Sequence, residues 1–228
     1  MSTSVNRQGR KRQATRQRIS DIATALFATR GFDHVTIDAI AEAADVGRMT
    51  VFNHFARKED LFFDREDEIR QIIRNALTGP LSGHPLDVLR QLAHEMVSKN
   101  APFLRFAPQT QGFIDTLTAS ETLKSRARAL RDIMTDDLRE ALSAALPCPP
   151  DDPSLHLAAA LLVTGWTTAF IEAQRLYRRE NDSRSAQNLF LSLVDTSTVS
   201  ALYALRQIDT SPQTNQVSPR AGKTGAPD

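Results

Sequence analysis

The deciding stretch of the sequence runs from Thr36 to Leu61 and reads TIDAIAEAADVGRMTVFNHFARKEDL. Four apolar residues at its start recur at the i, i+3, i+4 and i+7 spacing of one helix face. These residues are Ile37, Ile40, Ala41 and Ala44. Because Thr36 stands directly before them and is a favourable N-cap residue, a short helix is predicted to begin there.

A second short helix follows a break at residues 45–47. Its apolar side is formed by Val51, Phe52 and Phe55. The opposite side carries Arg48, Met49, Thr50, Asn53 and His54. Two short helices joined by a turn of about three or four residues are typical of a helix-turn-helix, whose second helix lies in the major groove of DNA. A plain helical hairpin with a solvated polar face is the alternative.

The side chains on the polar side suit DNA recognition. Asn53 can pair with the edge of an adenine and Arg48 with a guanine, while Thr50 and His54 can reach phosphates or bases. Lys58 follows the second helix, where its ammonium can hold the DNA backbone.

Composition sets the outer limits. The chain has 228 residues, of which 41% are hydrophobic and 24% charged, so it can bury one large core or two smaller ones. Its single cysteine, Cys148, excludes an intramolecular disulfide framework and is typical of a reducing cytoplasm. No apolar signal-peptide segment is visible near the start, and we expect a cytoplasmic protein.

Charge is distributed unevenly along the chain. The net charge is +1, yet the first 18 residues hold six basic residues and no acidic one. The six are Arg7, Arg10, Lys11, Arg12, Arg16 and Arg18. A basic arm next to a helix-turn-helix can neutralise phosphates or enter the minor groove, and we expect Arg12 and Arg16 to contact DNA. A solubilising tail is the alternative. Residues 1–10 are predicted to be disordered.

A helix is predicted from about Lys11 to Thr29, with Gly31 just past its end as a C-cap. It forms a three-helix unit with the two short helices, and its small core is expected to contain Phe27, Phe32, Phe52 and Phe55. A single longer helix should follow from about residue 60 to residue 78.

These features together resemble a known family. The pattern consists of a basic first helix, a Gly-Phe joint, TI-x-x-IA-x-x-A-x-V and TVF-x-HF-x-x-KE-x-L. It resembles the N-terminal DNA-binding domain of the TetR family of transcriptional regulators over roughly residues 12–62. The resemblance implies an all-helical dimer of about nine helices, with a helix-turn-helix domain at residues 11–57 and a ligand-binding and dimerisation domain at residues 58–208. Residues 209–228 are rich in Ser, Thr, Pro and Gly and are predicted to be a disordered tail.

The resemblance assigns roles to matching positions. By position, Thr36 is a capping and phosphate-contacting residue, Thr50 and His54 face DNA, and Lys58 holds a phosphate. The remaining members of the set, Arg48, Met49 and Asn53, occupy variable positions that tune the choice of DNA sequence.

Three residues depart from the family pattern. Phe52 stands where many members have Tyr, so a phosphate hydrogen bond through a phenol is lost. Asp45 replaces the usual turn Gly, and Asp is among the few residues that tolerate a positive φ. Gly47 replaces a Ser cap, which weakens the capping of the second helix.

The remainder of the chain is predicted to be helical. Helices are expected near residues 86–96, 103–106 and 113–117, and a long one from about residue 120 to 146 ends at the proline-rich segment 147–153.

Residues 154–171 carry no formal charge and begin a helix that continues to about residue 179. An apolar surface all round a helix indicates burial on two sides, and we expect no membrane span here. With a second helix over about residues 185–208 and the same pair from another subunit, it would form a four-helix bundle. The expected dimer residues are Leu162, Trp166, Phe190, Leu193, Val194 and Ala201.

No catalytic or metal-binding motif is recognisable, so we expect neither an enzyme nor a cofactor. A pocket for a small organic ligand is expected from the family, and its candidate residues are His94, Phe103, Phe106, Phe113, Met134, Trp166 and Phe170. Ordinary core packing is the alternative for each. The sequence therefore predicts a homodimeric regulator, by default a repressor, that binds a pseudo-palindromic DNA operator and is released by a small ligand. The alternative is a helical ligand-binding or interaction protein, or an enzyme, with a vestigial helix-turn-helix.

Overall fold

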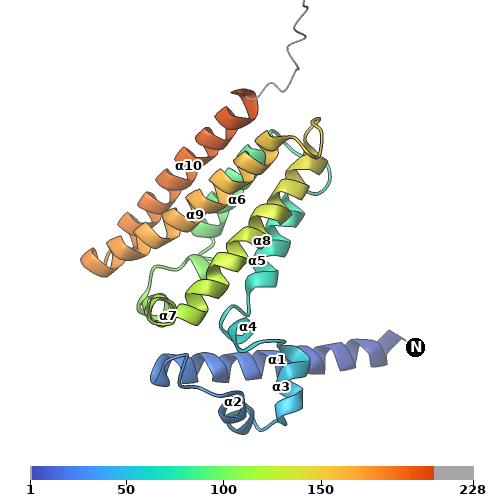
Figure 1. Cartoon of the computed structure of the whole chain (residues 1–228), viewed down its shortest axis with the longest axis vertical. Coiled ribbons are helices and arrows are strands. Elements are labelled where there is room, and N and C mark those ends of the chain that lie inside the picture. The colour runs from blue at the N-terminus through green and yellow to red at the C-terminus, as the bar shows by residue number, and fades with distance from the viewer. Residues whose placement is uncertain (1, 208–228) are drawn as a thin grey trace, which may run out of the picture.

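The computed structural model describes residues 2–207, apart from the side chains of residues 2–7, 103 and 207. Within that range it consists of ten α-helices and one short 3₁₀ helix (Figure 1). The helices are α1 (Ser2–Arg30), α2 (Ile37–Ala43), α3 (Arg48–His54), α4 (Lys58–Phe62), α5 (Glu66–Ala76), α6 (Pro85–Ser98), η1 (Pro102–Leu104), α7 (Pro108–Ala119), α8 (Glu121–Ala145), α9 (Pro153–Glu180) and α10 (Ser183–Gln207). The all-helical prediction is confirmed.

Helices α1 to α4 form a head at one end of the molecule, and α5 to α10 form an elongated body above it (Figure 1). Three rings in the core of the head pack at centroid distances of 4.9 Å for Phe27–Phe32, 6.3 Å for Phe27–Phe62 and 6.2 Å for Phe32–Phe62. Phe55 is buried in the same core. The prediction for Phe52 was wrong, because Phe52 points outward from α3 and Phe62 of α4 fills the core instead.

The N-terminal helix is longer than the sequence predicted. It begins at Ser2, so the prediction of disorder was wrong for residues 2–10, and so was the predicted helix start near Lys11. The arm holds one helix-weakening residue, Gly9, and its Arg, Lys and Gln side chains are good helix formers. The helix ends as predicted, because Gly31 has φ 77° and its N–H donates to the carbonyl of Phe27 at 3.0 Å.

The single connector helix predicted after the head is divided into α4 and α5. Tertiary contacts of the intervening Asp64 explain the break. Its carboxylate accepts a hydrogen bond from the hydroxyl of Ser20, and its carbonyl accepts one from Arg16 at 3.4 Å, both from α1. Leu61 and Phe62 of α4, which follow the domain boundary predicted at residue 57, are buried in the core of the head.

The body is built around the α9–α10 hairpin, which packs against α6 and α8. The long helix predicted near residues 120–146 is confirmed as α8, and the proline-rich segment ends it at Ala145. Small residues allow α9 and α10 to approach closely. A Cβ built on Gly165 would lie 2.2 Å from the Cβ of Ser197, so only glycine fits there without displacing the neighbouring helix.

By length and composition alone, α9 and α10 are apolar enough to cross a membrane. One third of the apolar window of each helix is buried in the protomer. Leu155, Leu162 and Val163 of α9 and Ala201 of α10 lie inside the core between the helices. The predicted tail, residues 209–228, lies outside the described residues.

Candidate nucleic-acid interface

Helix α2 begins where the sequence predicted. Thr36 has extended backbone angles, and its hydroxyl oxygen accepts a hydrogen bond from the N–H of Ala39 at 3.1 Å. The helix buries Ile40 and Ala41 against α1 and thereby supports the turn. The predicted role of Thr36 as a cap is confirmed, and its contact with a DNA phosphate stays a prediction.

The turn into α3 contains Asp45 and Gly47, two of the residues that depart from the family pattern, and both behave as predicted. Asp45 adopts a left-handed conformation with φ 50°, which a non-glycine residue tolerates at some cost. Gly47 is the N-cap of α3 and makes no side-chain hydrogen bond, because it has no side chain to cap with. Thus α3 is oriented by the packing of its apolar side rather than by a capping side chain.

Helix α3 buries Val51, and Phe55 at its C-cap is also buried. These two anchors turn the other side of the helix outward. Arg48, Met49 and Asn53 are exposed there, and Thr50 and His54 are half-buried at its edges. Phe52, which the sequence placed on the apolar side, is exposed among them.

Arg48 has partners within the head. Its Nη1 atom lies 3.1 and 2.9 Å from the two carboxylate oxygens of Asp38 on α2, and its guanidinium lies 5.6 Å from the centre of the Phe52 ring. Both members of the ion pair are exposed, so the pair contributes little to stability and can exchange for a DNA contact. The sequence analysis did not identify Asp38 as the partner of Arg48, although its position in the first turn of α2 could be predicted from the sequence.

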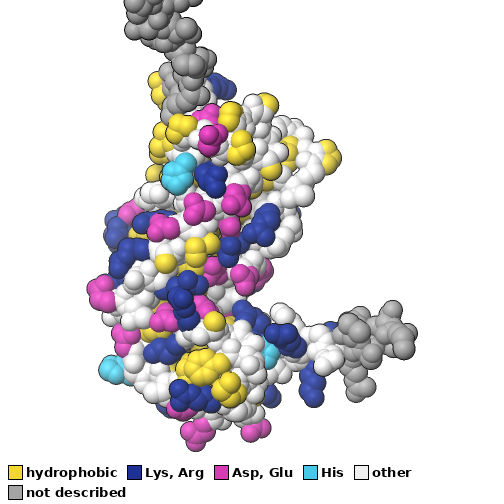
Figure 2. Space-filling view, turned by 45° about the vertical axis from the view of Figure 1, so that its right-hand side comes forward, with side chains coloured by type: hydrophobic (Ala, Val, Ile, Leu, Met, Phe, Trp, Pro, Cys, Tyr) yellow, Lys and Arg dark blue, Asp and Glu magenta, His cyan; other side chains and the backbone are white. Residues whose placement is uncertain are grey.

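Arg16 lies across the end of α3. Its guanidinium donates to the carbonyl of His54 at 2.6 Å and lies 4.1 Å from the centre of the Phe55 ring. It is half-buried, whereas Arg12, one turn earlier on α1, is exposed. Arg16 therefore fixes α1 against α3, and Arg12 has the freer side chain. Figure 2 shows further Lys and Arg side chains along the projecting part of α1.

The position of His54 affects its protonation. Burial lowers the pKa of His54 below its ordinary value of 6.5, and the positive charges of Arg12 and Arg16 lower this pKa further. The imidazole is therefore neutral near pH 7 in the free protein.

Lys58, at the start of α4, is turned towards the head. Its ammonium donates to the carbonyls of Phe32 and Val35, each at 3.0 Å, and lies 4.1 Å from the centre of the Phe32 ring. It ties α4 to the loop that precedes α2. Since an ammonium has three donors, one remains for a phosphate beside these two bonds.

The candidate ligand residues are spread over different parts of the structure. Phe113 of α7 stacks on Phe62 at 4.3 Å and packs against the core of the head. Phe106 is buried in a body cluster that Phe170 packs against. His94 on α6 lies near the surface, with Nε2 2.9 Å from a carboxylate oxygen of Asp195 on α10.

The other three candidates also differ in setting. Met134 lines a cavity of about 30 Å³ between α5, α8 and α9. Trp166 packs between the two body clusters, and its buried indole N–H has no hydrogen-bond partner among the described residues. The side chain of Phe103 lies outside what the structure describes. The six candidates whose side chains are described therefore lie in different parts of the structure.

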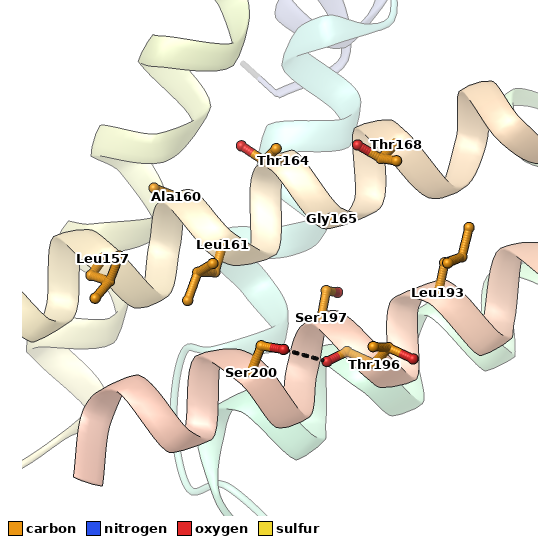
Figure 3. A pocket seen from close by; sticks show the side chains of 10 residues that line it. All are labelled: Leu157, Ala160, Leu161, Thr164, Gly165, Thr168, Leu193, Thr196, Ser197 and Ser200. Carbon is orange, nitrogen blue, oxygen red and sulfur yellow. Dashed lines mark hydrogen bonds between the residues drawn. The ribbon is translucent and has the colours of Figure 1, made fainter. Parts of the chain in front are cut away.

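A groove lies on the outer side of the α9–α10 hairpin. Figure 3 shows side chains of both helices facing it, and its volume is about 390 Å³. It is lined by Leu157, Ala160, Leu161, Thr164, Gly165, Thr168, Leu193, Thr196, Ser197 and Ser200.

Most of the residues predicted for the dimer interface are buried within the protomer. Leu162, Phe190, Val194 and Ala201 are at most 2% exposed and lie inside the protomer. Both sides of these helices are apolar, so the helical spacing of apolar residues did not indicate which side faces the protomer's own core. Leu193 does line the groove. Trp166 is half-buried and does not line it.

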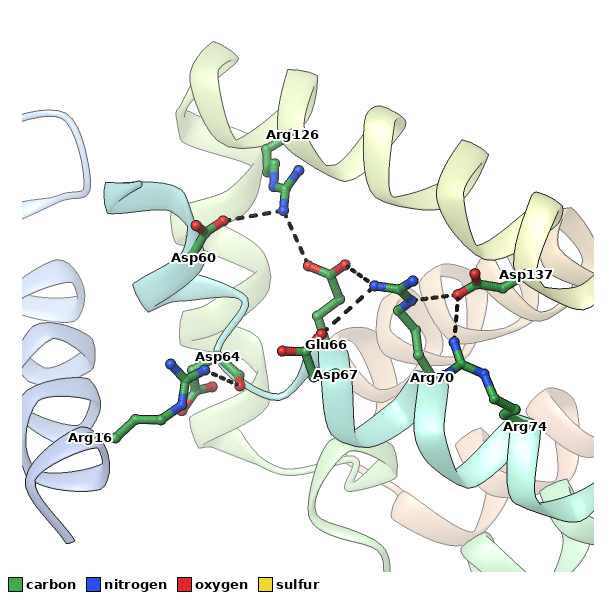
Figure 4. A network of polar contacts seen from close by, with 9 residues as sticks. All are labelled: Arg16, Asp60, Asp64, Glu66, Asp67, Arg70, Arg74, Arg126 and Asp137. Carbon is green, nitrogen blue, oxygen red and sulfur yellow. Dashed lines mark hydrogen bonds and ion pairs between the residues drawn. The ribbon is translucent and has the colours of Figure 1, made fainter. Parts of the chain in front are cut away.

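A chain of ion pairs connects the head to the body (Figure 4). Arg126 of α8 lies 3.2 Å from Asp60 of α4 and 3.3 Å from Glu66 of α5. Arg70 of α5 lies 2.6 Å from Asp137 of α8. Burial raises the pKa of Glu66, while the neighbouring charges of Arg126 and Arg70 oppose this rise.

The head and body also share hydrogen bonds and ring contacts. Ser120, the N-cap of α8, accepts a hydrogen bond from the N–H of Leu123 at 3.3 Å. Its hydroxyl donates to Asp33 in the loop of the head at 2.9 Å. With the stacked pair Phe62 and Phe113, these contacts make the position of the head depend on α7 and α8.

The structure thus defines an all-helical protein with a helix-turn-helix head on a helical body. The family model of bacterial regulatory proteins, tetR family, matches residues 19–64, which are the head without its basic arm. The head therefore matches the DNA-binding domain of the TetR family of bacterial regulatory proteins, as the resemblance indicated.

Curated relatives match mainly over the head. MftR of Mycobacterium tuberculosis, a transcriptional regulator assigned to mycofactocin biosynthesis, is 47% identical over 53 residues, which cover 23% of this chain and 27% of that protein. RaaS of the same organism, an HTH-type transcriptional regulatory protein, is 28% identical over 170 residues, covering 74% of this chain and 76% of RaaS. The chain spans only 27% to 39% of the length of five other relatives, MftR included.

The whole fold has solved counterparts. The structure of SmeT in complex with triclosan aligns with a TM-score of 0.55 at 17% identity, and the alignment covers 82% of this chain and 91% of the SmeT chain. At this level of identity the match establishes the fold of the body as well as that of the head, and it does not extend to a ligand.

Proposed function

We propose that the protein is a homodimeric transcriptional regulator, by default a repressor, which binds a pseudo-palindromic DNA operator and is released by a small organic ligand. One observation carries the proposal. Helix α3 is held by Val51 and Phe55 so that Arg48 and Asn53 project outward, within a head that matches the family model. Asparagine and arginine on an exposed second helix are suited to reading base edges in the major groove.

The residues of the head divide into two roles in this proposal. Arg48, Thr50 and Asn53 meet base edges, and Met49 lies beside them. Arg12, Thr36, His54 and Lys58 meet phosphates, which set the register of the protein without selecting a sequence. Arg16 does not contact DNA in this proposal. Its guanidinium donates to the carbonyl of His54 and supports the end of α3.

The proposed dimer forms through the α9–α10 groove. The helices expose Leu157, Ile171, Val199 and Tyr203, and a partner that covered these side chains would remove their apolar surface from water. A two-fold axis through this surface would create a four-helix bundle and place two α3 helices in successive major grooves about 34 Å apart. It would also shield both apolar helices from water, consistent with a cytoplasmic protein that needs no membrane.

Ligand release is proposed to act through α5 and α8. The cavity of about 30 Å³ beside Met134 is far smaller than the roughly 300 Å³ of a typical small-molecule site. An organic ligand would therefore have to separate the surrounding helices. Since Arg70 and Asp137 join α5 to α8 and Arg126 joins α8 to Asp60 of the head, such a movement would also shift the head. The ligand can weaken DNA binding only as far as it prefers the shifted state.

Trp166 is the proposed contact for the polar end of the ligand. Buried donors are normally paired, and its indole N–H has no partner among the described residues. Replacing Trp166 by Phe keeps an aromatic ring and removes the donor. This variant should bind DNA as the unmodified chain does and respond less to a releasing compound. An unchanged response would contradict the assignment of Trp166.

The test of DNA binding starts with genomic DNA fragments of the source organism, including DNA beside the gene itself. The full-length protein should enrich a pseudo-palindromic sequence, and Asn53→Ala should weaken binding by about 1–3 kcal/mol and relax the preference at one base pair of each half-site. If the chain enriches no sequence, a ligand-binding or interaction protein with a vestigial helix-turn-helix is favoured. A panel of small organic compounds, with triclosan as one member because SmeT binds it, then tests release.

A further inference from the structure

The outward side of α3 has an apolar centre. Met49 is 68% exposed and Phe52 is 37% exposed, and they lie three residues apart on the same side of the helix. Their neighbours on this side are Arg48 and Asn53, both exposed. Single exposed apolar residues are common on protein surfaces, but two large ones at the centre of a proposed DNA-reading side need a partner that is itself partly apolar.

The side chain of Phe52 has an aromatic ring and no polar atom. A phenylalanine cannot donate to a phosphate, so it contributes by contact with a methyl group or by stacking. The guanidinium of Arg48 lies 5.6 Å from the ring centre, and Asp38 holds Arg48 from the other side. These contacts limit the movement of the ring without covering it.

Two arginines near the apolar pair suit a polyanionic partner, whose phosphates would replace Asp38 as the partner of Arg48. Arg48 flanks the apolar pair on α3, and the exposed Arg57 follows the helix. Within the major groove the distinct apolar feature is the 5-methyl group of thymine, which favours contact with apolar side chains. The charges and the apolar pair therefore fit one partner, a DNA half-site that contains thymine.

We infer that Phe52, with Met49 beside it, contacts thymine methyl groups and makes thymine a specificity-determining base of each half-site. The inference rests on the proposed function and extends it to residue 52, which the family resemblance had assigned only a missing phosphate contact. Arg48 and Asn53 read neighbouring base pairs through hydrogen bonds, while Phe52 selects the methyl group between them.

Removal of the methyl group tests the inference directly. Duplexes that the full-length chain enriches from a random-sequence pool are made twice, with thymine or with uracil, which differs only by lacking the 5-methyl group. The unmodified chain should bind the uracil form about fourfold more weakly for each contacted methyl group, and about fifteenfold more weakly when two half-sites contribute one each. Measurement of both affinities in the same salt gives this ratio.

Variants assign the effect to the side chain. Phe52→Ala should bring the thymine-to-uracil ratio close to one, and Met49→Ala should lower it in part. Phe52→Tyr keeps the ring and should keep the ratio. Asn53→Ala serves as the matched control, because it should weaken binding to both duplexes equally and leave the ratio unchanged. Phe52 and Met49 are exposed, so thermal unfolding should confirm that the alanine variants remain folded.

Two results would overturn the inference while leaving DNA binding intact. One is equal binding of both duplexes by the unmodified chain, and the other is a ratio that persists in the Phe52→Ala, Met49→Ala double variant. Failure of the unmodified chain to enrich any duplex would instead contradict the proposed function, and the inference would be rejected with it.

Discussion

Both ends of this molecule expose large apolar side chains, and the surroundings of these side chains differ. On α3, Met49 and Phe52 lie between Arg48 and Asn53. The α9–α10 hairpin exposes Leu157, Ile171, Val199 and Tyr203, and its groove is lined by leucines together with Ser, Thr, Ala and Gly and by no charged residue. Exposure alone therefore does not indicate the partner. A charged neighbour favours DNA, whereas small neutral neighbours let a second helix approach closely.

The two ends also differ in how their positions are maintained. The head is held by an aromatic core and by cationic side chains that donate to backbone carbonyls, as Arg16 and Lys58 do. The hairpin is held by close packing of small residues, with Gly165 opposite Ser197. Substitutions should therefore act on the hairpin through volume and on the head through hydrogen bonds and charge.

The largest effect is expected in the groove. Leu193→Glu would place two carboxylates in a two-fold interface, at a cost of about 3–5 kcal/mol for each buried unpaired charge. The variant should elute from a sizing column as a monomer, and the unmodified chain as a dimer. Met49→Glu is the matched control, since it adds the same charge at the other exposed apolar site and should not change the elution volume. Dimeric elution of Leu193→Glu would contradict the proposed interface.

The next largest effect concerns the hairpin itself. Gly165→Ala adds a Cβ that would meet Ser197 at 2.2 Å and should lower the free energy of unfolding by about 1–3 kcal/mol. Gly112→Ala on α7 adds the same group in open space and should be neutral or stabilising by up to about 1 kcal/mol. Denaturant unfolding measures both. Addition of Ser197→Gly to Gly165→Ala should restore part of the loss, and no recovery would mean that the two helices do not meet there.

A third prediction concerns the contribution of Lys58 to the stability of the head. Lys58→Met removes the donor shared by the carbonyls of Phe32 and Val35 and should lower the free energy of unfolding by about 1 kcal/mol. Lys99→Met, at an exposed ion pair, should change it by less than about 0.5 kcal/mol. If Lys58 also contacts a phosphate, the salt dependence of DNA affinity should fall by about one contact. Reduced stability with an unchanged salt dependence would assign Lys58 to structure alone.

The smallest effect is expected for His54. In the free protein its pKa is lowered, chiefly by burial, so protonation opposes folding and this contribution to stability falls as the pH drops below 6.5. A phosphate beside the ring would raise the pKa, so DNA binding would take up a proton and the affinity would increase as the pH falls through about 6.5. His54→Gln should flatten this dependence at constant salt. An equal slope in both proteins would exclude a phosphate contact by His54.

Local sequence patterns predicted much of the head. The spacing of apolar residues identified α2 and α3, Thr36 identified the cap, and Gly31 identified the end of α1, because each of these features depends on neighbours within about one helical turn. The same patterns failed for Phe52 and Phe62. Which ring enters the core depends on where α4 crosses α1, and residues on two separate helices decide this.

The sequence by itself determined that the chain is helical, where most helices begin and end, and that a helix-turn-helix follows a basic arm. These properties arise from periodicity, capping and helix-breaking residues, which act over short distances along the chain. Tertiary structure alone decided which side of α9 and α10 is inside, that Arg16 and Lys58 bind carbonyls within the head, and that Phe52 faces outward. The physical reason is that an apolar or cationic side chain can be satisfied in several ways, and the choice belongs to partners far away in the sequence.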